Sequence, residues 1–260
     1  MTQEERLDYL IRGLLAEHPP ECFAPAEPAS TKEKWRQFRS LVNIRPPRPA
    51  GADWLAVQDA CLREDIARRG ITDAADITPL EGSLCLWRGD VTTLRADAIV
   101  NAANAQLLGC FAPCHLCIDN AIHTFAGVQL RLACAQIMER QGFDEPCGRA
   151  QVTPAFNLPA RFVLHTVGPL VRGAPTTADD RRLASCYRSC LELAEKNGVQ
   201  SLAFCCISTG VFHFPNERAA YIAVGTVRDY LRRHSTAMKV IFNVFTDIDE
   251  SLYRSLLGAL

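Results

Sequence analysis

Apolar side chains recur at intervals of three and four over the first 70 residues, the spacing that gives a helix one apolar face. This spacing predicts three helices, over residues 3–16, around residues 35–41 and over residues 53–70. The second and third are separated by Pro46, Pro47 and Pro49, because proline cannot continue a helix. A proline-rich linker at 19–28 separates the first two. We therefore expect residues 1–75 to form an all-helical N-terminal extension.

Beyond residue 80 short apolar runs alternate with helical patterns. The runs predict strands at residues 84–87, 98–100, 162–166, 202–207 and 240–245. Helices are predicted near residues 118–140, 179–197, 216–234 and 249–258. Such alternation is typical of an α/β sheet with helices on both faces, whose ligands gather at the carboxyl ends of the strands. We assign residues 76–260 to this second domain.

Composition and charge exclude several classes of function. The 260 residues are 48% hydrophobic and 22% charged, and the formal net charge is -1. This charge gives no electrostatic reason to expect nucleic-acid binding, which requires several contacts to phosphates. No apolar run approaches the length of a membrane span, and the acidic start of the chain resembles neither a secretory signal nor a transit peptide. We expect a cytoplasmic protein.

The 12 cysteines do not follow the pattern of a disulfide framework. Six lie within apolar stretches and are interpreted as small core residues in a reducing compartment, namely Cys85, Cys134, Cys186, Cys190, Cys205 and Cys206. Others crowd into G-C-F-A-P-C-H-L-C-I-D-N-A-I-H at residues 109–123. Thiolates and imidazoles are the ligands that zinc prefers.

The spacing of this cluster favours three zinc ligands. Cys110, His115 and Cys117 form a C-x4-H-x-C set. Three protein ligands leave a coordination position open, as in catalytic zinc sites. Cys114 is adjacent to His115, so the two side chains diverge in most backbone conformations. A closed site that adds Cys114 and a site without metal stay as alternatives.

Four motifs occur in an order that resembles the macrodomain family, whose members bind ADP-ribose. They are G-D-V-T at 89–92, D-A-I-V-N-A-A-N at 97–104, I-D-N-A-I-H followed by A-G at 118–127, and I-S-T-G-V-F at 207–212. The usual pattern carries G-G-G-V-D-G-A-I-H after N-A-A-N, where this chain has its cysteine and histidine cluster. The replacement resembles the zinc-containing microbial macrodomains. The resemblance covers residue 80 or so to the end, and implies a three-layer α/β/α fold with a mixed central sheet.

The resemblance also implies where ADP-ribose binds. Asp90 would accept a hydrogen bond from the adenine amino group, beside Val91, unless it only caps its turn. Phe245, at the end of the last strand, would lie against the adenine face, or else belong to the core. Backbone N–H groups near a helix start at Pro215 would bind the phosphates. These groups belong to Ser208, Thr209, Gly210, Val211 and Phe212.

Around the distal ribose the resemblance gives catalytic roles to Asp119 and Asn104. An amide such as that of Asn104 can both donate to and accept from ribose hydroxyls. Asn101 is a second candidate for ribose contact, although a bond to the loop backbone is the role we favour. Asp119 either caps its helix or, beside the metal, orients water, binds a hydroxyl or ligates zinc. His123 is interpreted as a hydrogen-bonded structural histidine.

By resemblance, the chain is expected to be a zinc-dependent hydrolase with one Zn²⁺ per chain. It would remove mono-ADP-ribose from Asp and Glu side chains of modified proteins and release ADP-ribose. The alternative is a non-catalytic module that binds ADP-ribosylated proteins and carries a structural zinc. The group is also associated with a lipoyl-carrier protein modified by a sirtuin-type ADP-ribosyltransferase. No nucleic-acid or membrane partner is expected.

Overall fold

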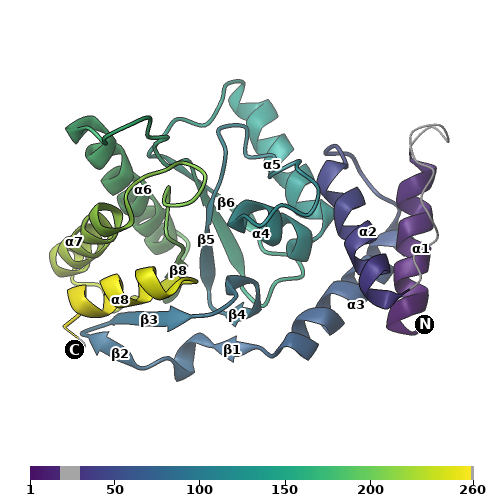
Figure 1. The fold of residues 1–260 in the computed structure, drawn as a ribbon, viewed down its shortest axis with the longest axis horizontal. Coiled ribbons are helices and arrows are strands. Elements are labelled where there is room, and N and C mark those ends of the chain that lie inside the picture. The colour runs from purple at the N-terminus through teal and green to yellow at the C-terminus, as the bar shows by residue number, and fades with distance from the viewer. Residues whose placement is uncertain (18–29, 259–260) are drawn as a thin grey trace.

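The structure of the protein is a computed structural model that describes residues 1–17 and 30–258. Three helices come first, α1 (Gln3–Ala16), α2 (Thr31–Ile44) and α3 (Ala52–Arg69). They lie together at one end of the molecule in Figure 1. All three predicted N-terminal helices are therefore confirmed, whereas the linker predicted at 19–28 lies outside the described residues. The division into two domains at residue 76 stays a prediction.

A mixed sheet of seven strands follows, in the order β2-β3-β9-β8-β5-β7-β6. Its strands are β2 (Pro79–Glu81), β3 (Leu84–Arg88), β5 (Ala98–Ala102), β6 (Ala150–Pro154), β7 (Phe162–Thr166), β8 (Ser201–Phe204) and β9 (Lys239–Val244). The five central strands are parallel, and the edge strands β2 and β6 run antiparallel to their neighbours. A separate parallel pair joins β1 (Thr72–Asp73) to β4 (Leu94–Arg95). The carboxyl ends of five strands therefore share one edge of the sheet.

Helices cover both faces of this sheet, as predicted. They are α4 (Ile118–Ala126), α5 (Val128–Gln141), α6 (Thr177–Lys196), α7 (Asn216–His234) and α8 (Asp247–Leu256). Ile99 and Ile241 join the core that includes α1 to α5, whereas Val100 and Phe242 join the core of α6 to α8. Because successive side chains of a strand point to opposite faces, strands covered on both sides have continuous apolar sequences. Among the described helices none is long and apolar enough to cross a membrane.

Two predicted elements end earlier than the apolar pattern suggests. The helix predicted near residues 118–140 is two helices, because Gly127 adopts φ 97°, a conformation that favours glycine and interrupts a helix. The strand predicted at 202–207 ends at Phe204. Ile207 is still fully buried. The apolar run therefore continues beyond the strand, because the loop that follows it also packs on the core.

The short edge strands β2 and β6 were not predicted, since their side chains are mostly polar or exposed and form no apolar run.

The interpretation of the apolar cysteines is confirmed for five of them, Cys85, Cys134, Cys186, Cys190 and Cys205, which are buried. Cys206 is only half-buried. Every cysteine in the described part of the chain is a free thiol.

Candidate functional site

The predicted site residues lie in loops that leave the carboxyl ends of the parallel strands. Residues 89 and 90 follow β3, residues 103–117 follow β5, residues 205–214 follow β8, and Phe245 follows β9. Parallel neighbours place these ends along one edge of the sheet. Ligands of α/β sheets bind at such an edge.

The three predicted zinc ligands lie together in the loop after β5. Ligand atoms of Cys110, His115 and Cys117 are all within 4.8 Å of one another, and Cys110 Sγ lies 3.6 Å from His115 Nδ1. Burial raises the pKa of Cys117 to about 11, so without a cation its thiol is neutral at pH 7. Two sulfurs and one imidazole fit zinc better than a harder cation such as Mg²⁺. The residues present therefore fit the ion that the sequence predicts.

Cys114 points away from the other three residues. Its backbone adopts φ 55°, its N–H donates to Asn43 Oδ1 at 2.9 Å, and its Sγ–H donates to the carbonyl of Arg36 at 3.4 Å. Both partners belong to α2. The geometry thus groups Cys110, His115 and Cys117 without Cys114, which agrees with the divergence expected for adjacent residues.

Asp119 lies in the first turn of α4, which begins directly after Cys117. It does not cap the helix, because Cys117 occupies the N-cap and its Sγ accepts a hydrogen bond from the backbone N–H of Asn120 at 3.4 Å. The Asp119 carboxyl is buried, and Asn101 Nδ2 donates to its Oδ1 at 2.8 Å. Burial raises the pKa of Asp119 to about 6, although the bond from Asn101 and the charge of Arg131 act to lower it. The capping interpretation of Asp119 is therefore wrong.

Asn101 is fully buried and orients Asp119. Its amide nitrogen also lies 3.2 Å from His165 Nδ1, while His165 Nε2 lies 2.9 Å from Thr153 Oγ1. An amide NH₂ only donates, so we assign the His165 proton to Nε2. Asn101 shares the face of β5 with Ile99 and therefore points into the core. The structure thus gives Asn101 a positioning role through Asp119 in place of the loop-backbone bond, and its predicted ribose contact stays a prediction.

A second group of potential metal ligands is fully buried. Ligand atoms of His123, Cys134 and His165 also lie within 4.8 Å of one another. His165 Nε2 carries a proton in the network above, so it has no free lone pair for a metal. His123 Nε2 is 3.5 Å from Asp119 Oδ1, but neither ring nitrogen of His123 makes a hydrogen bond within the described chain. Burial holds the pKa of His123 well below its usual range. His123 is therefore a buried neutral residue. The prediction that it is hydrogen-bonded is wrong within the described chain.

Asn104 closes the loop that leads to the predicted zinc ligands. Its Nδ2 donates to the carbonyl of Gly109 at 3.0 Å, and its Oδ1 accepts from the backbone N–H of Gln106 at 3.1 Å. Gly109 adopts φ 78°, and a Cβ built there would lie 2.7 Å from Cγ of His123. The loop therefore depends on a glycine at this position, and the distal-ribose role of Asn104 stays a prediction.

We expect Gly109→Ala to lower the free energy of unfolding more than Gly82→Ala, a matched control. Both positions have positive φ, so each alanine costs about 1 kcal/mol in backbone strain. Nothing lies within 4 Å of a Cβ at Gly82, whereas at Gly109 the imidazole of His123 must move. Overpacking adds about 1–3 kcal/mol at Gly109. Urea unfolding of both variants measures the difference, and equal losses would contradict the close approach of Gly109 to His123.

At the predicted adenine end, Asp90 caps the turn Val91–Thr93. Its Oδ1 accepts a hydrogen bond from the backbone N–H of Thr92 at 2.9 Å, which is the capping role given above as the alternative for Asp90. Its Oδ2 pairs with Nη1 of Arg69 at 2.6 Å. Arg69 comes from the end of α3, and its guanidinium lies 3.9 Å from the centre of the Phe125 ring. The N-terminal helices therefore contact the site through a residue that sequence reasoning did not identify.

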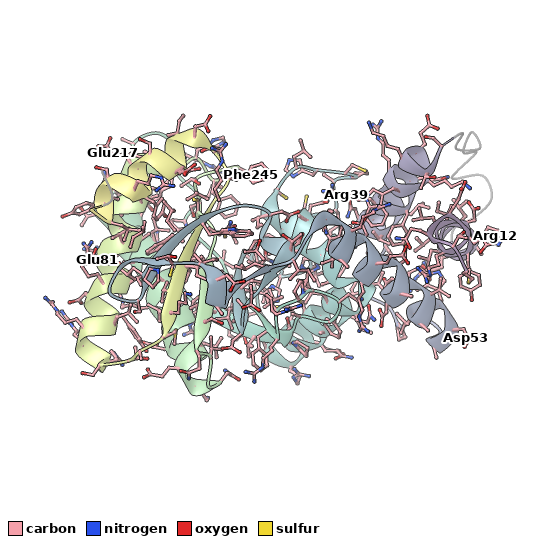
Figure 2. All side chains as sticks on the ribbon, turned by 90° about the horizontal axis from the view of Figure 1, so that it is seen from below. Arg12, Arg39, Asp53, Glu81, Glu217 and Phe245 are labelled. Atoms are coloured by element: carbon pink, nitrogen blue, oxygen red, sulfur yellow. The ribbon has the colours of Figure 1, made fainter. Side chains whose placement is uncertain are left out.

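The other two residues predicted to lie near adenine, Val91 and Phe245, differ in solvent exposure. The side chain of Val91 is buried in the core, so only its backbone can contact a ligand. Phe245 is 76% exposed, because it follows the last residue of β9 and lies beyond the sheet. Figure 2 shows Phe245 at the surface, on the same side of the molecule as Arg39 of α2. The alternative that Phe245 is a core residue is therefore wrong.

The predicted phosphate loop joins β8 to α7. Ser208 adopts φ 68° and is buried, and α7 begins directly after Pro215, as expected. Within the described chain no acceptor is found for the backbone N–H groups of Gly210, Val211 and Phe212. Thr209 donates both its backbone N–H, at 3.4 Å, and its hydroxyl, at 3.0 Å, to the carbonyl of Cys206. A short run of free N–H groups beside a helix start is suited to an anion.

The chain is similar in sequence and fold to several known proteins. The family model of the Macro domain matches residues 100–223. A protein of Treponema medium named protein-ADP-ribose hydrolase is 53% identical over 262 residues, which cover 99% of this chain and 100% of that protein. A protein of the same name from Staphylococcus aureus strain MRSA252 is 48% identical over 97% of this chain and 95% of its own length. The solved Trypanosoma brucei macrodomain in complex with ADP-ribose is 32% identical, with a TM-score of 0.66 over 85% of this chain and 95% of that one.

Proposed function

The chain belongs to the macrodomain family and is a hydrolase similar to protein-ADP-ribose hydrolases, and from this premise we propose a zinc-dependent reaction at acidic side chains. The enzyme would remove mono-ADP-ribose from Asp and Glu residues of modified proteins and release ADP-ribose. The observation that carries the proposal is the cluster of Cys110, His115 and Cys117 beside the buried Asp119. We include in the proposal the lipoyl-carrier substrate and the sirtuin-type transferase that the sequence resemblance implies.

Cys110, His115 and Cys117 would hold the zinc. When bound there, zinc supplies Lewis acidity and can lower the pKa of a water towards about 7. Two thiolates and an imidazole would supply three of the four ligands usual for zinc, which would leave one to come from outside the protein. His115 is exposed, whereas both cysteines are half-buried. The cluster is therefore accessible from solvent on the side of its histidine.

Asp119 would act on the water or on a ribose hydroxyl. Hydrolysis adds water across the bond between ribose C1″ and the carboxylate oxygen of the substrate, so a proton must be accepted from the water. Burial raises the pKa of Asp119 to about 6, which makes its carboxylate a stronger base than an ordinary aspartate. The 2.8 Å bond from Asn101 fixes which oxygen of the carboxylate is free to accept.

The remaining site residues would bind the rest of ADP-ribose. Free N–H groups at Gly210, Val211 and Phe212 would bind the diphosphate beside the start of α7. Asp90 would accept from the adenine amino group, and the exposed ring of Phe245 would lie against the adenine face. Binding at these distant points would position C1″ beside Asp119, so that binding energy contributes to the rate.

The proposal is tested with a protein mono-ADP-ribosylated on glutamate or aspartate, for example a modified lipoyl-carrier protein, and a matched substrate modified on serine. We expect release of ADP-ribose from the acidic substrate only. Chelation should lower the rate about 100-fold or more, because several kcal/mol of transition-state stabilisation are lost, and added zinc should restore it. Undiminished release by metal-free protein would exclude the zinc mechanism. Binding of ADP-ribose without release in either state would indicate the non-catalytic module.

A further inference from the structure

We propose that helix α2 of the N-terminal extension positions the metal-binding loop, residues 108–117, and that Arg39 is its principal positioning residue. The proposal rests on the proposed zinc function of this loop. Three separate contacts carry it, at the middle of α2, at its C-terminal part and at its last carbonyl groups. The partners of α2 in these contacts lie in the loop, in α4 and, through Arg131, in α5, some 70 to 90 positions later in the chain.

Arg39 and Asn120 together bind the backbone of the loop. The guanidinium of Arg39 donates to the carbonyl of His115 at 3.0 Å and, through Nη2 and Nε, to Asn120 Oδ1 at 2.8 and 3.2 Å. The amide of Asn120 then donates to the carbonyls of Ala112 at 3.0 Å and of Cys110 at 3.4 Å. The backbones of two of the three proposed ligands, Cys110 and His115, are therefore held by this pair.

Asn43 holds the middle of the loop. Its Oδ1 accepts from the backbone N–H of Cys114 at 2.9 Å, and its Nδ2 donates to Thr124 Oγ1 of α4 at 3.0 Å. Cys114 has φ 55°, which costs about 1–3 kcal/mol for a residue with a side chain. Two hydrogen bonds that Cys114 donates to α2 offset this strain, one from its N–H to Asn43 Oδ1 and one from its Sγ–H to the Arg36 carbonyl. The turn between the ligands is therefore stabilised from α2.

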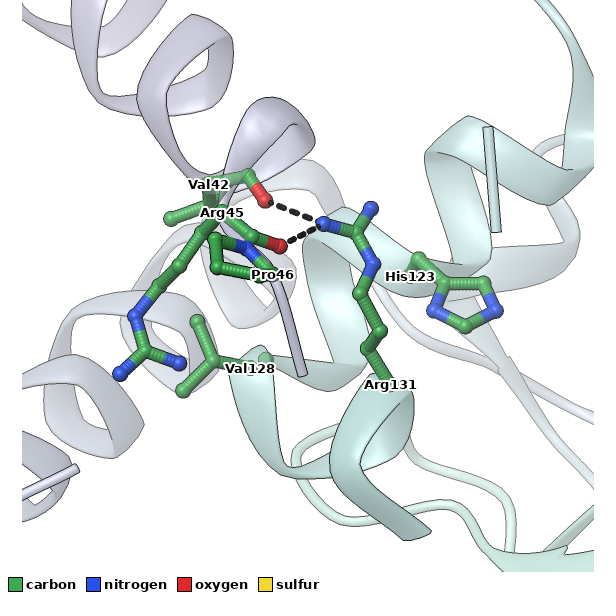
Figure 3. Close-up of a pocket in the computed structure, with 7 residues that line it drawn as sticks. Val42, Arg45, Pro46, His123, Val128 and Arg131 are labelled. Atoms are coloured by element: carbon green, nitrogen blue, oxygen red, sulfur yellow. Dashed lines mark hydrogen bonds between the residues drawn. The ribbon is translucent and has the colours of Figure 1, made fainter. Parts of the chain in front are cut away.

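Arg131 of α5 joins the end of α2 to the start of the loop. Figure 3 shows its guanidinium donating to the carbonyls of Val42 and Arg45, the former at 3.1 Å. Its Nε donates to the carbonyl of Leu108 at 2.7 Å, and the guanidinium lies 4.2 Å from the centre of the Phe111 ring. The last carbonyls of a helix have no partner within it and favour a cation. The guanidinium of Arg131 thus binds the carbonyl groups at the end of α2 and also the carbonyl of Leu108, the first residue of the loop.

The loop itself has few internal bonds that could set the ligand geometry. Between residues 108 and 117 the described structure gives one backbone bond, from the N–H of His115 to the carbonyl of Ala112 at 3.2 Å. Its conformation is therefore imposed by neighbours, mainly those on α2. Residues that orient metal ligands typically change metal affinity 10- to 100-fold when they are replaced.

The test compares Arg39→Ala with Lys34→Ala, a control on the same helix. Lys34 forms ion pairs of 2.8 Å with Glu4 and Asp8 of α1, so its loss weakens the packing of α2 without touching the loop. Competition with a chromogenic chelator should show zinc Kd raised about 10- to 100-fold in Arg39→Ala and unchanged in Lys34→Ala. Arg39→Lys should fall between them, because an ammonium cannot reproduce the bidentate contact.

A second readout separates this proposal from the zinc function itself. In metal-free protein, the amides of residues 110–117 should exchange with deuterium faster in Arg39→Ala than in wild type or Lys34→Ala. Equal zinc Kd and equal exchange in the two alanine variants would overturn the positioning role. If wild-type protein binds no zinc, the proposed function fails, and the exchange measurement alone decides whether α2 holds the loop.

Discussion

Cys117→Ala should remove the bound zinc and lower hydrolase activity about 100-fold or more, whereas Cys114→Ala should retain most of both. Cys117 contributes one of three ligand atoms that lie within 4.8 Å of one another. A zinc site with two protein ligands is too weak to stay occupied, and the Lewis acidity lost with the ion is worth several kcal/mol. The thiol of Cys114 points toward α2 and donates to the carbonyl of Arg36, so its loss leaves the cluster in place.

The control for this prediction uses the second cysteine ligand. Cys117 also caps α4, so its replacement has a structural cost, whereas Cys110 makes no cap and Cys110→Ala isolates the ligand effect. Elemental analysis of zinc per chain is compared with the rate of ADP-ribose release for all three variants. Equal zinc loss in Cys114→Ala would favour a closed site of four ligands. Full zinc occupancy in both Cys110→Ala and Cys117→Ala would show that this cluster is not the metal site.

Asp119→Asn is expected to lower kcat by about 10²- to 10⁴-fold with zinc retained, because a carboxamide cannot accept the proton from water. The substitution preserves size and leaves an oxygen to accept the 2.8 Å bond from Asn101. Burial raises the pKa of the native carboxyl to about 6, so a neutral amide at this position should not destabilise the fold. Single-turnover rates and zinc content measure the two effects separately.

Asn101→Ala provides the companion variant. Because Asn101 is buried and bonds to Asp119, we expect its replacement to act through Asp119, with a smaller loss of kcat, about 10-fold, and unchanged binding of ADP-ribose. If Asp119→Asn keeps kcat within a few-fold of wild type, Asp119 is not the proton acceptor. If Asp119→Asn instead loses zinc, Asp119 is a ligand of the metal, which is the other role its position allows.

The alternation of strands and helices could be predicted because each element carries its own hydrophobic period. Central strands such as β5 and β9 are buried on both faces, so they form apolar runs that need no knowledge of their neighbours. The edge strands β2 and β6 lack such runs, since no residue of β2 and only Thr153 of β6 is buried. The break at Gly127 also escaped prediction, because glycine within a helical pattern is compatible with either a break or a continuous helix.

The grouping of Cys110, His115 and Cys117 could be predicted for a similar reason. Cys110, His115 and Cys117 lie within eight residues of sequence, so spacing alone limits how their side chains can meet. The roles of the residues around them were harder to predict from the sequence. Asp119 was expected to cap its helix or to act in the site, and only the position of the Cys117 sulfur shows that the cap is taken.

The sequence by itself determined the order of elements, the family resemblance and the three candidate ligands, because periodicity and short spacings are local properties of the chain. Only the tertiary structure decided which residues surround the three candidate ligands and Asp119. Arg39 meets Asn120 across 81 positions, and Asn101 meets His165 across 64. Such partners are chosen by how distant helices and strands pack, and a polar side chain carries no local signal of which buried group it will satisfy. The partners of residues 108–117 are therefore determined by the packing of the helices and not by the local sequence.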